Sequence, residues 1–272
     1  MEIGLNRVQN SRNSSNTSIL FLGTGGGRIN LLKQIRGTGG FRINSDSADI
    51  HIDPGPGALL HSLELKQDPL KLDVLIVTHN HIDHVNDANL FVEALSQYTL
   101  KKQGILVASK NVLEGDHNGD RGVTKYHQGK VHEVYLANWG EKRKFKTKKS
   151  EFEIEIIKTQ HDEPSAFGFK LFLDGKVIGY TTDTEPFDGI ADCYRNCDVL
   201  IINCLKPKSD EYKGHLTTND CINILKIAKP KLAVLSHLGI KIIDIADSEA
   251  KKIEKVTGVK CIAAKDGQRI EV

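Results

Sequence analysis

The chain has 272 residues, with 37 Lys and Arg against 35 Asp and Glu, so its formal net charge at pH 7 is only +2. A protein that binds nucleic acid through its overall positive charge would be more basic than this. No apolar run approaches the length of a membrane-spanning helix. The five cysteines are not spaced as a disulfide framework, which favours a cytoplasmic protein.

The N-terminal part is polar and then becomes strand-like. Residues 1–18 are expected to form a polar lead-in rather than a signal peptide, because they lack an apolar centre, and residues 19–272 are expected to form a single domain. A strand over 18–22 ends at the glycine-rich segment 23–27. That segment lacks the Gly-Lys-Ser/Thr ending of a P-loop, so we expect a flexible loop near the functional cleft, with phosphate contact secondary.

Strand-like runs then alternate with helical patterns along the rest of the chain. Strands are expected at 41–44, 49–53, 73–77, 105–108, 151–158, 167–173, 177–181, 198–203, 232–235 and 260–263, and helices at 85–97, 218–228 and 248–256. Strand-rich runs punctuated by helices in both halves predict an α/β fold in which two sheets pack together with helices outside.

The segment after the strand at 73–77 contains an unusual density of metal-ligand side chains: His79, His81, Asp83 and His84. Imidazole and carboxylate groups together suit zinc and similar ions. Alternate residues of an extended segment share a face, so His79 and His81 are expected on one side, with Asp83 and His84 on the following turn. Solvated histidines at a strand end are the alternative, but four such residues together favour a metal site.

This His-x-His-x-Asp-His pattern resembles the signature of the metallo-β-lactamase-fold superfamily of metal-dependent hydrolases. The resemblance implies four further residues in a fixed order, and the chain supplies Asp53, His161, Asp183 and His237, each after a strand-like run. It also implies a four-layer αββα sandwich of two mixed sheets, with the metals along one edge.

The resemblance further assigns a role to each residue and implies two divalent metal ions. Zn²⁺ is expected, and Mn²⁺ and Fe²⁺ are also compatible with these ligands. Asp53 is expected to support the ligands by hydrogen bonding, although an Asp before Pro54-Gly55 could serve only the turn. His161 and His237, taken singly, could also be core histidines. The implied ligands are His79, His81 and His161 for one metal, Asp83, His84 and His237 for the other, and Asp183 between them.

Two further features resemble ribonuclease Z and related phosphodiesterases. One is the Gly23-Thr24 pair after the first strand. The other is His215, within Gly214-His215-Leu216-Thr217. The resemblance implies that the metals generate hydroxide from water at neutral pH, that Asp83 orients or deprotonates this water, and that His215 protonates the leaving group. An imidazole of ordinary pKa, about 6.5, suits that task. A polar residue at a helix entry is the alternative for His215.

Residues 98–150 are expected to be a variable insertion with a substrate-gating role. They end in the basic run 142–149, which contains Phe145 and could steer RNA by its charge or form a solvated hairpin. The long tRNA-clamping arm and the Pro-x-Lys-x-Arg-Asn loop of ribonuclease Z have no counterpart here. A smaller phosphodiester is therefore favoured over tRNA.

The favoured function is that of a dinuclear metal-dependent phosphodiesterase acting on a small or cyclic phosphodiester or on an RNA end. The alternative is hydrolysis of a lactone, thioester or other carboxylic derivative by the same centre, without need of His215. A di-iron redox function is disfavoured, because that branch carries a carboxylate where His81 stands. A homodimer is a further expectation, since related phosphodiesterases often pair.

Overall fold

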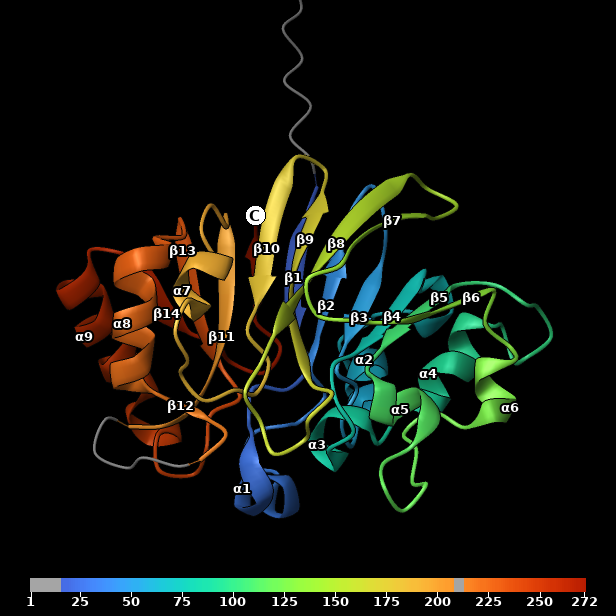
Figure 1. Ribbon diagram of the computed structural model, residues 1–272, viewed down its shortest axis with the longest axis horizontal. Coiled ribbons are helices and arrows are strands. Elements are labelled where there is room, and N and C mark those ends of the chain that lie inside the picture. The colour runs from blue at the N-terminus through green and yellow to red at the C-terminus, as the bar shows by residue number, and fades with distance from the viewer. Residues whose placement is uncertain (1–15, 208–212) are drawn as a thin grey trace, which may run out of the picture.

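The structure is a computed structural model that describes residues 16–207 and 213–272, so most of the predicted lead-in lies outside the described residues. Two β-sheets lie face to face in the middle of the molecule, and helices cover their outer faces (Figure 1). The α/β class and the two mixed sheets agree with the prediction. Every helix in the described part of the chain is too short or too polar to cross a bilayer.

The first sheet carries helices from the N-terminal half of the chain on its outer face (Figure 1). Its strands are antiparallel from β15 to β3 and parallel from β3 to β6. The strand order is β15 (Arg269–Glu271), β1 (Ser18–Phe21), β2 (Phe41–Asn44), β3 (Ile50–Ile52), β4 (Val74–Val77), β5 (Ile105–Ala108) and β6 (Glu133–Leu136). The helices on this side are α2 (Ala58–Glu64), α4 (Ala88–Leu95), α5 (Lys110–Glu114) and α6 (Lys125–Gln128), with the 3₁₀ turn η1 (Pro69–Lys71).

The second sheet is parallel from β14 to β10 and antiparallel from β10 to β7. Its order is β14 (Cys261–Ala263), β13 (Leu232–Ser236), β11 (Val199–Lys206), β10 (Lys176–Tyr180), β9 (Phe167–Leu173), β8 (Glu151–Lys158) and β7 (Lys142–Lys146), and β12 (Leu216–Thr217) pairs with β11. Its outer helices are α7 (Ile190–Cys193), α8 (Thr218–Ala228) and α9 (Ala246–Thr257), with the turn η2 (Ile243–Ile245). The short helices α1 (Gly27–Lys33) and α3 (Ile82–Val85) lie at one end of the sandwich (Figure 1).

The main core fills the space between the two sheets. Strand β8 shows how the sequence builds it, because its buried Phe152, Ile154 and Ile156 alternate with more exposed glutamates. They join a cluster with residues of the first sheet such as Ile52 and Ile76. Each such apolar side chain contributes about 1.5–3 kcal/mol when it is fully buried. This burial fixes which face of each strand points inward.

The observed elements depart from the expected ones in several places. The helix expected at 85–97 is present but shorter, as α4 (Ala88–Leu95). A turn separates it from α3, where Asp87 N–H donates to the carbonyl of Pro54 and the Asp87 carboxylate accepts from Leu59 N–H. The helices and strands with no counterpart among the expected ones are α1, α2, α3, α5, α6, α7, β6, β12 and β15. The basic run forms β7 and its turn into β8, which is the hairpin alternative.

Candidate active site

The candidate site lies where strands of both sheets end. His79 follows β4, His161 follows β8, Asp183 follows β10 and His237 follows β13. Asp53, after β3, and His237 adopt left-handed backbone conformations, with φ of 51° and 54°. Such strain at non-glycine residues is found mainly where the surrounding structure holds a functional group in place. The structure thus brings together residues that are up to 184 positions apart in the sequence.

The first histidine group contains His79, His81 and His161. His161 Nδ1 donates to the carbonyl of Gly214 at 2.9 Å, which in a neutral ring leaves the lone pair on Nε2, and this atom lies 3.2 Å from His81 Nδ1. His79 Nδ1 lies 3.1 Å from the Thr78 hydroxyl, while its Nε2 is fully buried without a hydrogen-bond partner. Lone pairs that converge in this way are ready for a cation.

The second group contains Asp83, His84 and His237. His84 Nδ1 donates to Asp53 Oδ2 at 3.0 Å, which leaves Nε2 facing His237 Nε2 at 3.2 Å. His237 Nε2 in turn lies 3.3 Å from Asp83 Oδ2. Asp53 therefore makes the supporting hydrogen bond that was expected of it.

Asp183 lies between the two groups. Its Oδ2 is 3.4 Å from His84 Nε2, 3.3 Å from His237 Nε2 and 3.9 Å from His79 Nε2. His215 enters from the loop before β12, with its Nδ1 3.7 Å from the same oxygen. The structure thus places every predicted site residue within one cluster.

The electrostatics of the cluster favour positive charge. Burial lowers the pKa of His84, but Asp183, Asp83 and Asp53 outweigh it and hold this pKa well above its ordinary value. Burial raises the pKa of Asp183, yet the neighbouring histidines hold it well below the usual range. Three carboxylates around a buried imidazole stabilise a positive charge on that ring, and they would likewise favour a metal cation bound beside it.

The residues present fit divalent metal ions. The donors are imidazole nitrogens and carboxylate oxygens, with several of the nitrogens already oriented by hydrogen bonds from their second ring atom, as metal-binding histidines generally are. Each of four sets of three side chains has potential ligand atoms within 4.8 Å of one another: His79, His81 and His161; His79, His84 and Asp183; Asp83, His84 and His237; Asp183, His215 and His237.

One expectation about His215 needs correction. Its side chain is 14% exposed, and burial lowers its pKa to about 4 rather than leaving it near 6.5. The ring is therefore neutral at pH 7 in the free protein. A proton donor at this position needs additional negative charge beside it, which an anionic substrate brings.

The glycine-rich segment is next to the site but is held in place rather than flexible. Gly26 N–H donates to the carbonyl of Leu238, and Leu238 N–H donates to that of Thr24. A β-carbon on Gly26 would lie 2.2 Å from Nδ1 of His237. The glycine therefore allows the chain to pack directly on the candidate ligand His237, and Gly27 begins α1.

A cleft of about 870 Å³ opens onto Asp83, Asp183 and His215. Its walls combine apolar and cationic side chains, from α1, from the α3 region and from the loops after β11 and β13. The apolar ones include Ile29, Leu32, Ile82, Leu205 and Ile240, and the cationic ones are Arg28, Lys206, Lys213 and Lys241.

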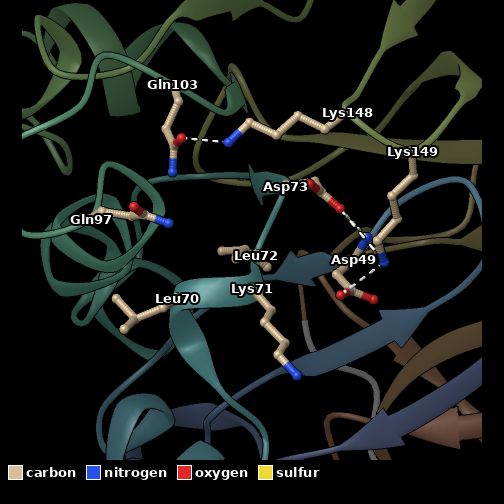
Figure 2. A pocket seen from close by; sticks show the side chains of 9 residues that line it. All are labelled: Asp49, Leu70, Lys71, Leu72, Asp73, Gln97, Gln103, Lys148 and Lys149. Carbon is tan, nitrogen blue, oxygen red and sulfur yellow. Dashed lines mark hydrogen bonds and ion pairs between the residues drawn. The ribbon is translucent and has the colours of Figure 1, made fainter.

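The basic run 142–149 does not line this cleft. Its last two lysines line a different pocket, shown in Figure 2, where Lys148 Nζ donates to Gln103 and Lys149 Nζ lies 3.0 Å from Asp49 and 3.8 Å from Asp73. Phe145 is buried rather than available for base stacking. These contacts favour the structural interpretation of the run over nucleic-acid binding.

Several residues of the site were not predicted from sequence. Asp162 lies 3.1 Å from His161 Nε2, Thr78 donates twice to Asp53, and Tyr180 and Asn203 bond to Asp53 and Asp183. Asp162 and Thr78 adjoin predicted ligands in sequence, which was an available signal. Asn203 is a single polar residue in the middle of an apolar run. That pattern could have marked it as a candidate site residue.

The comparisons with known proteins agree with this geometry. Residues 49–238 match the family described as "Beta-lactamase superfamily domain". The chain belongs to this superfamily. Together with the site, this makes the protein a metal-dependent hydrolase.

Two curated relatives illustrate the range of similarity. The uncharacterized protein MJ1374 of Methanocaldococcus jannaschii is 36% identical over 93% of this chain and 94% of its own length. Ribonuclease Z of Sulfolobus acidocaldarius is 24% identical over 81% of this chain and 87% of its own. The chain is therefore related to ribonuclease Z along most of its length, at low identity.

Two solved structures share the fold. The metallo-β-lactamase-fold protein YhfI of Bacillus subtilis superposes with a TM-score of 0.75 over 95% of this chain and all of its own, at 20% identity. A diphosphatase from the PhnP family superposes with a TM-score of 0.68 over 94% of this chain and 98% of its own, at 18% identity. At these identities the likeness shows the fold alone.

Proposed function

We propose that this hydrolase is a dinuclear phosphodiesterase that acts on a small or cyclic phosphodiester or on an RNA end. The observation that carries the proposal is the position of His215: its ring lines the cleft and lies 3.7 Å from Asp183, between the two ligand groups. A proton donor at this point suits an alkoxide leaving group. The relationship to a ribonuclease supports the same class of substrate.

The proposed centre holds two divalent ions, with Zn²⁺ as the expected metal and Mn²⁺ or Fe²⁺ as alternatives. When bound, such ions lower the pKa of a water from 15.7 to about 7 and polarise the phosphoryl oxygen. His79, His81 and His161 would hold one ion and Asp83, His84 and His237 the other, with Asp183 shared.

Asp83 and His215 would have different roles, Asp83 toward the attacking water and His215 toward the leaving oxygen. The pKa of Asp83, although raised by burial, is held below its usual range by His84 and His237, so the group stays a carboxylate that can accept a hydrogen bond from the attacking water. His215 is neutral in the free protein. The charge of a bound phosphodiester would raise its pKa and allow it to carry the proton that the leaving oxygen receives.

The cleft supports a small substrate. Its volume of about 870 Å³ lies in the range of small-molecule sites, and apolar side chains such as Ile82 and Leu205 alternate with cations such as Arg28. That composition suits an anion that carries an apolar or aromatic group. The basic run 142–149, which could have contacted an extended RNA, does not line the cleft.

The test compares substrate classes on one enzyme. Zinc-loaded protein is assayed with bis-p-nitrophenyl phosphate, a 2′,3′-cyclic nucleotide, a short RNA with a 3′ extension, and p-nitrophenyl acetate with a lactone as carboxylic substrates. Turnover of a phosphodiester that falls about 10²–10⁴-fold in His215→Ala is the expected result. His117→Ala is the matched control, since His117 is exposed and does not line the cleft.

Two outcomes would contradict the proposal. One is turnover of the ester or lactone alone, which would identify a hydrolase of carboxylic derivatives. The other is phosphodiester turnover that His215→Ala leaves unchanged. Replacing zinc by manganese or iron in the same assay identifies the most active metal, and light scattering tests the expected homodimer.

A further inference from the structure

The two oxygens of Asp183 have different partners. All four histidine contacts of this carboxylate involve Oδ2, at 3.3 to 3.9 Å from His79, His84, His215 and His237. Oδ1 instead accepts a hydrogen bond from Nδ2 of Asn203 at 2.7 Å. The two oxygens of a free carboxylate are equivalent, so the hydrogen bond from the Asn203 amide distinguishes Oδ1 from Oδ2 here.

The orientation of the Asn203 amide is determined by its partners. An ionised carboxylate only accepts hydrogen bonds, so the NH₂ end of the amide must face Asp183. The same Nδ2 lies 3.1 Å from the hydroxyl oxygen of Tyr180 and donates its second proton there. Asn203 is buried, with 3% of its surface exposed, and its backbone N–H donates a hydrogen bond to the Thr181 hydroxyl oxygen, so the residue has little freedom to move.

Tyr180 extends this chain of hydrogen bonds to the first sheet. Because its oxygen accepts from Asn203, its proton is donated to Asp53 Oδ2 at 3.0 Å. Asp53 Oδ2 also accepts from His84 Nδ1 at 3.0 Å. Tyr180 and Asn203 come from β10 and β11 of the second sheet, whereas Asp53 follows β3 of the first, so the chain of bonds spans the interface at the candidate metal centre.

We propose that Asn203 and Tyr180 are positioning residues for the metal centre: Asn203 turns Asp183 so that only Oδ2 faces the metals, and Tyr180 holds Asp53, and through it His84, in register with Asp183. The inference rests on the proposed dinuclear centre and goes beyond it. Neither residue touches the substrate cleft, so both act through the ligands they hold.

The test measures metal affinity in the full-length protein. Asn203→Leu removes the amide donor at similar volume, and Tyr180→Phe removes the hydroxyl while retaining the ring contacts with Phe41 and Phe169. Zinc affinity is measured by competition with a fluorescent chelator. Loss of a residue that orients metal ligands typically weakens binding about 10–100-fold, and we expect that range for both variants.

Tyr194→Phe is the matched control. Tyr194 is also a buried tyrosine, and its hydroxyl donates to the backbone carbonyl of Tyr180 at 3.1 Å, outside the chain that reaches Asp53. We expect this variant to retain zinc affinity within about twofold, although it too loses a buried hydrogen bond. Urea unfolding of the metal-free proteins records the purely structural cost of each change.

The outcomes separate this inference from the proposed function. Wild-type zinc affinity in both Asn203→Leu and Tyr180→Phe would overturn the positioning role while leaving the phosphodiesterase proposal intact, and if Asn203→Leu does not fold, Tyr180→Phe decides alone. A weakening equal to that of Tyr194→Phe would also overturn it. A wild-type protein that binds two zinc ions but hydrolyses no phosphodiester would defeat the proposed function, and the affinity comparison would still test the positioning role.

Discussion

Gly26 packs so closely against His237 that a β-carbon on the glycine would lie 2.2 Å from Nδ1 of the imidazole. The backbone of Gly26 is extended, so alanine is compatible with its conformation and only the contact with His237 is at stake. We expect Gly26→Ala to displace the ring, to weaken zinc binding at least tenfold and to lower phosphodiester turnover. Chelator competition and steady-state kinetics measure both effects.

A second glycine provides the control for this prediction. A β-carbon on Gly129 would meet only backbone oxygens at ordinary contact distances of 3.4 and 3.5 Å, and its φ of −66° is helical. Gly129→Ala should therefore leave zinc affinity and turnover unchanged. If Gly26→Ala behaves in the same way, His237 tolerates the displacement or is not a ligand.

Asp53 accepts four hydrogen bonds, from Thr78 N–H, the Thr78 hydroxyl, His84 Nδ1 and the Tyr180 hydroxyl. Asp53→Asn keeps the size and tolerates the left-handed backbone, but its NH₂ end cannot accept. At least one buried donor then loses its partner, at a cost of about 1–3 kcal/mol in the free energy of unfolding. Urea unfolding and zinc competition should both show a loss, whereas the exposed Asp46→Asn should show neither.

His51 predicts a pH dependence of stability that does not involve the metal ligands. Its ring is fully buried against Phe91, and burial, together with the charge of Arg42, lowers its pKa from 6.5 to about 3. Below pH 6.5 the unfolded chain therefore binds a proton that the folded protein does not. This contribution to stability is complete above pH 6.5 and is lost as the pH falls towards 3, by at most about 1.4 kcal/mol per pH unit.

The measurement compares His51→Gln with the wild type by urea unfolding between pH 7.5 and 5, both with excess chelator. The variant should lose less stability on acidification, because glutamine does not titrate. The exposed His117→Gln should follow the wild-type curve. Parallel curves for His51→Gln and the wild type would show that His51 is not the group that titrates.

The positions of the basic side chains predict which of them affect turnover. Lys144 and Lys146 are exposed on β7, away from the cleft, whereas Arg28 lines the cleft. The pair Lys144→Glu and Lys146→Glu should leave kcat/KM for a small phosphodiester unchanged, and Arg28→Glu should lower it several-fold through repulsion of the anion. An equal loss in both proteins would indicate a general field effect rather than contact in the cleft.

Much of the fold was predictable because most strands are short apolar or alternating runs, and the pairing of 41–44 with the strand at 49–53 followed from the turn between them. Strand β15 and helix α1 were not predictable. Their sequences have weak periodicity, and the pairing of β15 with β1 joins the two ends of the described chain. The helix expected at 85–97 was predicted too long: α4 covers only Ala88–Leu95, because the contacts of Asp87 with Pro54 and Leu59 favour a turn before it.

The sequence by itself determined the candidate donor set, because the side chains at 79, 81, 83 and 84 are neighbours in any conformation, and the order of the remaining candidates matched the superfamily. Only the tertiary structure decided how these donors are oriented. Hydrogen bonds from Asn203 to Asp183 and from Tyr180 to Asp53 join residues of separate strands, and burial lowers the pKa of His215 to about 4. Whether a side chain can bind a metal can be inferred from its residue type alone. Its orientation and its desolvation depend on neighbours that are distant in the sequence.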